Sequence, residues 1–322
     1  MYEIKFEKDN LFQLDEIIPS LRGTYLFQKS TIAYEQEYGT IDTVYTCLLL
    51  KTKIIVGGFY YTVDSDLCWS YFKKPISVSI IDSLSSDDQF ELMQILVSSL
   101  EQKMKKEELK KMKLHFNSFL FSSFMKFPVK LHSFYEALID LKSSDETIKR
   151  GFRRRYRSLF NWGLREMTFE RIDHLNPDEK KFEDFRNFHI EVSGRETRNK
   201  KTWDFQFEAL KKGNAFVELG VLEGKLVSAA LVLIGTAEAF YGVAVNNRTL
   251  MADKKPVGHA TMLRAIKHAK ELGLETFNLG YVGPEFSNDK EFEIARFKRG
   301  FASQIRLVNW FEIEYVAQGE EK

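Results

Sequence analysis

One short segment in the second half of the chain places a basic residue and a glycine at a predicted helix start. Residues 255–260 read Lys-Pro-Val-Gly-His-Ala, between an apolar run and a helix predicted over 257–272. The first N–H groups of a helix lack partners within it, and the helix dipole is positive there. This arrangement suits a phosphate or pyrophosphate, and Gly258 would let the ligand approach the backbone. The alternative is an ordinary helix start at which Pro256 fixes the entry of the chain.

A polar loop carries two arginines three positions apart, Arg195 and Arg198. A guanidinium group offers planar, bidentate hydrogen bonds that match a carboxylate or a diphosphate, so this pair is a candidate anion site. The alternative is a solvated loop, because exposed arginines often contribute nothing specific.

The run 149–157 holds six basic residues among nine and no acid. Such a run could bind tRNA or another polyanion. It lies on a predicted helix, so its arginines would point in several directions. It could equally be an interdomain helix whose long aliphatic stems cover apolar surface.

Caps, turns and apolar periodicity divide the second half into well-separated elements. The expected N-caps are Ser143, Asn176 and Thr202. Three of the predicted strands form an antiparallel meander over 215–245. The sequence predicts helices over 143–162, 176–192, 202–212, 257–272 and 289–299, and strands over 167–172, 215–222, 226–234, 237–245, 276–279 and 305–313.

The first half repeats this order of elements without any residue-level repeat. A long helix is expected from Ser86, with Leu92, Leu96 and Leu100 on its apolar face. We expect the boundary between the halves near Leu141. The sequence predicts helices over 11–21, 31–38 and 86–106, and strands over 2–6, 43–50, 54–63, 67–72, 112–116 and 133–141.

The composition is that of a globular protein. The 322 residues carry a net charge of +1 and are 44% hydrophobic, which argues against wholesale disorder and against a polycationic coat. The longest apolar run, 226–234, is far shorter than a membrane span, so no membrane helix or signal peptide is expected. Cys47 and Cys68 form no metal-ligand spacing, which fits a reducing cytoplasm and predicts no metal cofactor.

The order of elements in the second half resembles that of the GNAT acyltransferases. In that family the motif Gln/Arg-x-x-Gly-x-Gly/Ala binds the pyrophosphate of acyl-CoA, and Lys255-x-x-Gly258-x-Ala260 is similar. One branch, the FemAB-like acyltransferases, joins two GNAT-like units in one chain. The segments that resemble this branch are Ile139-Asp140-Leu141, Ser193 to Arg198 followed by Thr202-Trp203, Asn278-Leu279-Gly280, and Phe297 to Phe301.

The resemblance covers residues 135–312, and the first half only by architecture. It implies an α/β fold of the α+β type, with two tandem GNAT-like domains, each a mixed, mostly antiparallel sheet flanked by helices. A degenerate domain would span 1–141 and the acyltransferase domain 142–322. Around the start of the helix at Ser86, the carboxylates of Asp82, Asp87 and Asp88 would repel a pyrophosphate. One donor site per chain is therefore expected, with the first domain walling the acceptor cleft.

The resemblance implies transfer of an acyl group, most simply acetyl, from acyl-CoA to an amine of a sugar or nucleotide-linked sugar in surface glycan assembly. One alternative is an aminoacyl-tRNA-dependent peptidyl transferase acting on a cell-wall precursor. Another is a non-catalytic module that binds a polyanion. A cytoplasmic location is expected, and the oligomeric state stays open. The residues expected to contact the CoA phosphates are Lys254, Lys255, Val257, Gly258, His259 and Ala260.

In the Fem peptidyl transferases the lysine of the motif at 297–301 lies in the acceptor site. The resemblance makes Lys298 the first candidate for stabilising an oxyanion or holding an acceptor phosphate. The alternative is a plain helix end, with two core aromatics, an exposed lysine and a terminating glycine. The expected substrate-binding residues are Arg195, Arg198, Trp203 and Phe297.

An amine acceptor must lose a proton before or during attack, so a base is needed within hydrogen-bond reach. His189 and His259 are the candidates, and either could be a structural histidine. Tyr241 and Tyr281 could donate a proton to the departing thiolate or serve as packing aromatics. In the GNAT fold the thioester carbonyl usually meets a backbone N–H where the fourth and fifth strands splay.

Overall fold

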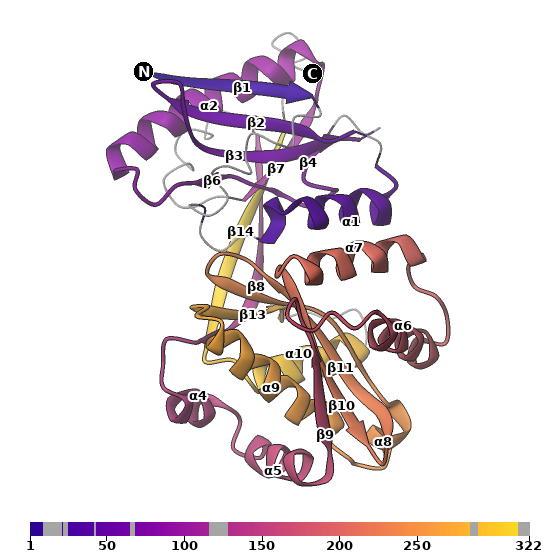
Figure 1. Ribbon diagram of the computed structural model, residues 1–322. Helices are drawn as coiled ribbons and strands as arrows, with labels where there is room; N and C mark the ends of the chain where they lie inside the picture. The colour runs from indigo at the N-terminus through magenta and orange to yellow at the C-terminus, as the bar shows by residue number, and fades with distance from the viewer. Residues whose placement is uncertain are drawn as a thin grey trace. The chain divides into compact units, whose positions relative to one another are not determined.

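The computed structural model describes residues 1–8, 21, 25–41, 43–64, 68–115, 128–283 and 289–314. The chain forms two compact units (Figure 1). Unit 1 comprises Met1–Arg22, Phe27–Ser133 and Val308–Lys322, and unit 2 comprises Gly23–Leu26 and Phe134–Leu307. The predicted helix over 11–21 falls, apart from its last residue, outside the described residues.

This division differs from the expected boundary at 141/142. Strand β8 (Val129–Asp140) begins in unit 1 and ends in unit 2. The last strand, β14 (Gln304–Glu314), pairs antiparallel with β7 (Lys111–His115) through Trp310 to Glu314. The second half of β14 therefore belongs to the sheet of unit 1, whereas its first residues, Gln304–Leu307, belong to unit 2.

The sheet of unit 1 has the strand order β1-β2-β3-β4-β7-β14. The pairs in this order are antiparallel, except that β4 and β7 run parallel. The short strand β5 also pairs with β7 in parallel. Helix α2 (Ser86–Lys106) buries the predicted face of Leu92, Leu96 and Leu100. The remaining elements are β1 (Tyr2–Lys8), α1 (Lys29–Gly39), β2 (Tyr45–Lys51), β3 (Ile54–Val63), β4 (Cys68–Ser70), β5 (Ile76–Ser77) and β6 (Ser79–Ile80).

The sheet of unit 2 has the order β8-β13-β12-β11-β10-β9, antiparallel except for the parallel pair β12–β13. Its strands are β9 (Thr168–Ile172), β10 (Ala215–Leu222), β11 (Lys225–Ile234), β12 (Glu238–Asn246) and β13 (Thr276–Tyr281). Its helices are α4 (Asp145–Gly151), α5 (Tyr156–Glu166), α6 (Glu179–Ser193), α7 (Lys200–Lys211), α8 (Arg248–Ala252), α9 (Val257–Glu271) and α10 (Asp289–Arg299). The predicted meander and the predicted fold class are both confirmed.

Both faces of this sheet are covered. Successive residues of a strand point to opposite faces, and in β10 Phe216 joins one buried cluster while Val217 joins another. The first cluster contains Met262 and Ile266 of α9, and the second contains Phe185 of α6. Burying each such side chain contributes about 1.5–3 kcal/mol, so the sheet is clamped between helices that carry the site.

Three helix starts in unit 2 lie one to three residues from the predicted positions. At α7 the side chain of Asn199 accepts the N–H of Thr202 at 3.1 Å, and the Thr202 hydroxyl donates to the Asn199 carbonyl at 2.7 Å. The predicted cap is therefore the residue that the true cap binds. The observed N-caps are Ser144, Asp178 and Asn199, where Ser143, Asn176 and Thr202 were expected.

The helix predicted over 143–162 is in fact two helices, α4 and α5. The chain turns extended at Phe152, whose side chain is buried against Phe160 and Phe301. The N–H of Arg153 then donates to the carbonyl of Gly300 at 2.8 Å. Burial of one aromatic side chain thus interrupts the helix, and the basic run lies on a corner instead of a continuous helix.

Candidate functional site

Unit 2 contains a cavity of about 790 Å³. The end of β12, the C-terminal end of α6 and the starts of α5 and α9 line it, together with one face of α10. Nine of the residues singled out in the sequence meet here. They are His189, Tyr241, Lys254, Lys255, Val257, Gly258, His259, Phe297 and Lys298.

The start of α9 is open. Pro256 is the N-cap residue and provides no side-chain hydrogen bond, unlike the capped starts of α6 and α7. In the described part of the chain, the Gly258 N–H donates to no acceptor and Lys254 and Lys255 form no ion pair. The N–H groups of Val257 and His259 donate to the carbonyls of Lys255 and Pro256, so the Gly258 N–H, the helix dipole and the two lysines make this end of the cavity suited to an anion.

Gly258 is required by packing as well as by access. A Cβ at this position would lie 2.5 Å from Oδ1 of Asn246, and that oxygen already accepts a hydrogen bond from Ser228 at 2.7 Å. The amide cannot move without breaking this bond. A larger residue at 258 would therefore disturb β12 itself, and Gly258→Val is not a clean test of ligand binding.

Ala260 is fully buried and does not line the cavity. A Cβ at Gly163 of α5 would lie 2.5 Å from the Ala260 methyl group, so the two helices approach closely at this point. The small residue in the resemblance motif therefore packs α9 against α5. Its contribution to a phosphate site would come from the backbone.

The parallel strands β12 and β13 separate beside the cavity. They pair only from Glu238 with Thr276 to Phe240 with Asn278, although β12 continues to Asn246. On the other edge of β12 the register with β11 shifts, so that Gly242 is an extra, bulged residue. The backbone of β12 beyond Phe240 is thus unpaired toward β13 and available to a ligand carbonyl.

The lining is strongly cationic. One acid, Glu293, stands among eight basic residues, and it is paired with Arg296 at 3.2 Å. Like charges held together are unfavourable until an anion arrives, so the cavity favours a polyanionic ligand. The basic residues are Arg153, Arg155, Arg248, Lys254, Lys255, Lys290, Arg296 and Lys298.

Lys298 is half-buried, not the exposed helical lysine that the plain helix-end interpretation requires. Burial lowers the pKa of its ammonium group to about 8, and the carboxylate of Glu136 opposes that shift. Its Nζ lies 3.5 Å from the carbonyl oxygen of Tyr281, its hydrogen-bond acceptor. At pH 7 the side chain is therefore a positioned cation that can also release its proton.

Both candidate histidines are neutral at pH 7. Burial lowers the pKa of His189 and of His259 to about 4. His259 is hydrogen-bonded to the Pro256 backbone and packs edge-on against Tyr156, 4.5 Å between centroids, which is a structural environment. Nδ1 of His189 is buried without a hydrogen-bond partner in the described residues, so this nitrogen is neither held by a hydrogen bond nor open to the cavity.

The two tyrosines differ. Tyr241 lines the cavity, and burial raises the pKa of its hydroxyl well above the usual 10, so it stays a phenol that can donate a proton. The Tyr281 side chain is 49% exposed and does not line the cavity. Its backbone carbonyl, through Lys298, is what connects it to the site.

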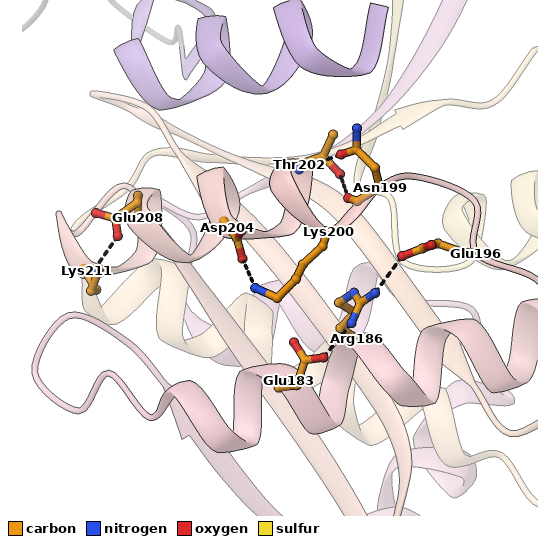
Figure 2. Close-up of polar contacts among 9 residues, drawn as sticks. All are labelled: Glu183, Arg186, Glu196, Asn199, Lys200, Thr202, Asp204, Glu208 and Lys211. Atoms are coloured by element: carbon orange, nitrogen blue, oxygen red, sulfur yellow. Dashed lines mark hydrogen bonds and ion pairs between the residues drawn. The ribbon is translucent and has the colours of Figure 1, made fainter.

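The loop between α6 and α7 lies outside the cavity lining. Arg195 is exposed, whereas Arg198 stacks over the ring of Trp203 at 4.9 Å. Trp203 is 2% exposed and forms part of the core, so it holds Arg198 rather than offering a surface of its own. Figure 2 shows how the loop is pinned, with Glu196 bonded to Arg186 at 2.6 Å.

The corresponding helix start in unit 1 is filled. Ser85 caps α2 by accepting the Asp88 N–H at 3.2 Å. The Asp88 carboxylate in turn accepts from Lys51, Ser85 and Tyr2. These hydrogen bonds, that of Lys51 first, lower the pKa of Asp88. A carboxylate of the chain therefore occupies the place that a ligand phosphate would need.

A polar cluster next to Lys298 is formed by Asn278 with Glu136, Glu238 and Arg306. Sequence reasoning singled out Asn278 only as part of a resemblance segment and missed the other three residues. Burial raises the pKa of Glu238 to about 7, Arg306 lowers it and Glu136 raises it. The acid at the beginning of an apolar strand was a visible signal for Glu238. The pairing of β8 with β13, which brings Glu136 beside it, had no signal in the sequence.

Across the described ranges, no three His, Cys, Asp or Glu side chains are grouped so as to hold a metal ion. Likewise, none of the helices described is both long enough and apolar enough to cross a membrane.

Comparison with solved structures gives similar folds at low sequence identity. FemX has 14% identity, with 97% of each chain covered and a TM-score of 0.71. L-PGS from Bacillus licheniformis has 12% identity, with 98% of this chain and 94% of that one covered and a TM-score of 0.61. A tandem GNAT protein from the clavulanic acid biosynthesis pathway has 13% identity, with 98% and 100% covered and a TM-score of 0.50.

No family model matches the sequence. No curated protein sequence matches it either. The likeness lies in the fold, and it extends over nearly the whole chain in both directions. The chain therefore has the FemAB-like fold, in which two GNAT-like units are joined in tandem.

Proposed function

We propose that the protein is an N-acyltransferase that moves an acyl group, most simply acetyl, from acyl-CoA to an amine of a sugar or nucleotide-linked sugar. The observation that carries the proposal is the cavity of unit 2. It combines an open helix start, two splayed parallel strands and a half-buried lysine. The helix start and the splayed strands would serve the donor, and the lysine would serve the reacting carbonyl or the acceptor.

The donor would bind along the splay of β12 and β13. Its pyrophosphate would meet the N–H groups at the start of α9 and the charges of Lys254 and Lys255. Its thioester carbonyl would lie against the unpaired edge of β12 beyond Phe240. A backbone N–H at this edge would stabilise the oxyanion as the carbonyl is attacked.

In the reaction the acceptor nitrogen forms a C–N bond to the thioester carbon, and the C–S bond then breaks. The amine proton passes to a base, for which neutral His189 is available, and the departing thiolate takes a proton, for which the Tyr241 phenol is available. Lys298 adds positive charge near the oxyanion or binds an acceptor phosphate. Arg195 and Arg198 would meet the acceptor's anionic group from the adjoining loop.

Aminoacyl-tRNA as the donor is the second candidate. Two observations favour it: the solved structures similar to this chain include FemX and L-PGS, and the cavity is lined by more cations than a pyrophosphate requires. In the Fem peptidyl transferases the amino acid reaches a cell-wall precursor from tRNA. The reacting groups would be the same, because an ester carbonyl replaces the thioester.

Mass spectrometry of ligands retained by the purified protein separates these donors. Bound CoA, nucleotide sugar or tRNA would each select one function. Acyl transfer is then followed as free thiol released from acetyl-CoA in the presence of amino sugars. No turnover with any acyl-CoA or aminoacyl-tRNA, by a protein that retains polyanions, would leave only the binding module expected as the third alternative.

A further inference from the structure

Asn278 is a buried polar residue whose side chain both accepts and donates hydrogen bonds. It is 3% exposed, and its Oδ1 accepts the N–H of Gly280 at 2.7 Å. Its Nδ2 donates to Glu136 and to Glu238, each at 3.4 Å. A buried amide that bonds several groups at once fixes local geometry, because moving it would leave those groups unpaired.

The bond to Gly280 shapes a bulge in β13. Asn278 lies opposite Leu138 of β8, but the next pair is Tyr281 with Glu136, so the chain makes an irregular step between them. Gly280 has φ +76°, a conformation that glycine adopts without strain. This step brings the Tyr281 carbonyl to Lys298, and a Cβ at Gly280 would lie only 3.4 Å from the Lys298 Nζ.

Glu136 lies on the same register step. It faces Tyr281 across the β8–β13 pair, is bonded by Arg306, and its charge acts on Lys298. Arg306 also lies 3.8 Å from Glu238. The other charged residues of α10 that line the cavity are Glu293 and Arg296, which are paired with each other, and Lys290. Among the described residues, Glu136 is thus the one acid of the neighbouring strands whose charge acts on Lys298.

We propose that Asn278 and Glu136 are positioning residues for Lys298, which hold the Gly280 bulge at its acceptor and place a carboxylate beside that bulge. This assignment rests on the proposed function only in taking Lys298 as a group of the reaction. Neither Asn278 nor Gly280 lines the cavity, so their effect on the reaction would be exerted through Lys298.

The first test measures the charge of Lys298 directly. Competitive labelling with acetic anhydride over a range of pH, read out by peptide mass spectrometry, gives the pKa of this amine without any assay of turnover. In Glu136→Gln the fraction of uncharged Lys298 at pH 7 should rise roughly fivefold, as expected when a nearby opposite charge is removed. Glu293→Gln is the matched control, since it removes an acid of the cavity that pairs with Arg296, and it should leave Lys298 unchanged.

The second test concerns the bulge. Asn278→Ala should alter Lys298 labelling at pH 7 by more than twofold and lower kcat for acyl transfer at least tenfold, with donor affinity unchanged. Thermal unfolding shows whether Asn278→Ala still folds. If it does not, the labelling of Lys298 in Glu136→Gln decides the test alone. Labelling of Lys298 that is the same in wild type, Glu136→Gln and a folded Asn278→Ala would overturn the assignment. Altered labelling in a protein that transfers no acyl group would uphold it and reject the proposed function instead.

Discussion

Two helix starts in this chain have the same place in the order of elements and opposite surroundings. At α2 of unit 1, Ser85 caps the helix and the Asp88 carboxylate is held by Lys51. At α9 of unit 2 no side chain caps the helix, and Lys254 and Lys255 stand beside it. A helix start becomes an anion site only where no side chain of the protein caps it. The fold contains two helix starts in this position, and the sequence leaves only the start of α9 uncapped.

The largest effect is expected from Lys298→Ala. Loss of a positioned charge that stabilises the oxyanion should reduce the rate of acyl transfer by about 10²–10³-fold, with little change in unfolding temperature. Single-turnover kinetics and thermal unfolding measure the two quantities. Lys290→Ala is the matched control, because Lys290 lies on the same helix and lines the same cavity. Equal rates of acyl transfer in both variants would contradict a specific role of Lys298 in the reaction.

The next largest effect is expected on CoA affinity, which distinguishes the start of α9 from the start of α2. Replacing both Lys254 and Lys255 by alanine should weaken CoA binding by about tenfold or more for each lysine that bonds a phosphate, since charge-assisted hydrogen bonds contribute ~1.5–3 kcal/mol. Calorimetry measures the affinity.

Lys51→Ala, at the start of α2, is the control for that experiment. It removes a partner of Asp88, so it should lower the unfolding temperature and leave CoA affinity unchanged. If Lys51→Ala weakens CoA binding as much as the double variant does, the donor site cannot be confined to α9.

The α6–α7 loop gives a smaller effect. Arg198 is fixed against Trp203, whereas Arg195 is exposed. Arg198→Ala should therefore raise the KM for an anionic acceptor about tenfold, and Arg195→Ala should raise it less. Arg198 also lowers the pKa of His189, after burial, so its removal should shift the acidic limb of the pH–rate profile upward. An acceptor KM unaltered in both variants would exclude the loop from the acceptor site.

The smallest effect is the pH dependence of stability. The folded-state pKa of Glu238, about 7, lies above its ordinary value of 4.5, so the folded protein binds the extra proton between these values. Stability relative to Glu238→Gln should be greatest below pH 4.5 and fall as pH rises to about 7. Lys298, with a pKa of about 8 against 10.5, has the opposite sign, and stability relative to Lys298→Met should rise from pH 8 to 10.5. Urea unfolding across pH measures both differences, and flat differences would mean that neither group is as buried as the fold places it.

Much of the difference between the starts of α2 and α9 could be predicted from the sequence, because it depends on residues close together in the chain. Lys255 and Gly258 predicted an anion site at the start of α9, and Asp82, Asp87 and Asp88 predicted that the start of α2 would repel an anion. The predicted helix over 289–299 has the observed bounds, since acids open it and a glycine follows it. Local signals of this kind act within one turn of the chain.

What could not be predicted depends on contacts between distant segments. The break at Phe152 comes from its burial against Phe301, and the close packing of Gly258 comes from Asn246. The role of Asn278 required the β8–β13 register, which no spacing in the sequence encodes. The pairing of Trp310–Glu314 in the last strand with β7 had no signal in the sequence either, because β7 lies almost 200 residues earlier in the chain.

Titration of the purified chain with CoA by calorimetry tests the central claim most directly. One open helix start and one filled start predict a stoichiometry of one CoA per chain, abolished or weakened by the double variant at Lys254 and Lys255. Two CoA molecules per chain, or one whose affinity is unaffected by that variant while Lys51→Ala removes it, would contradict the account.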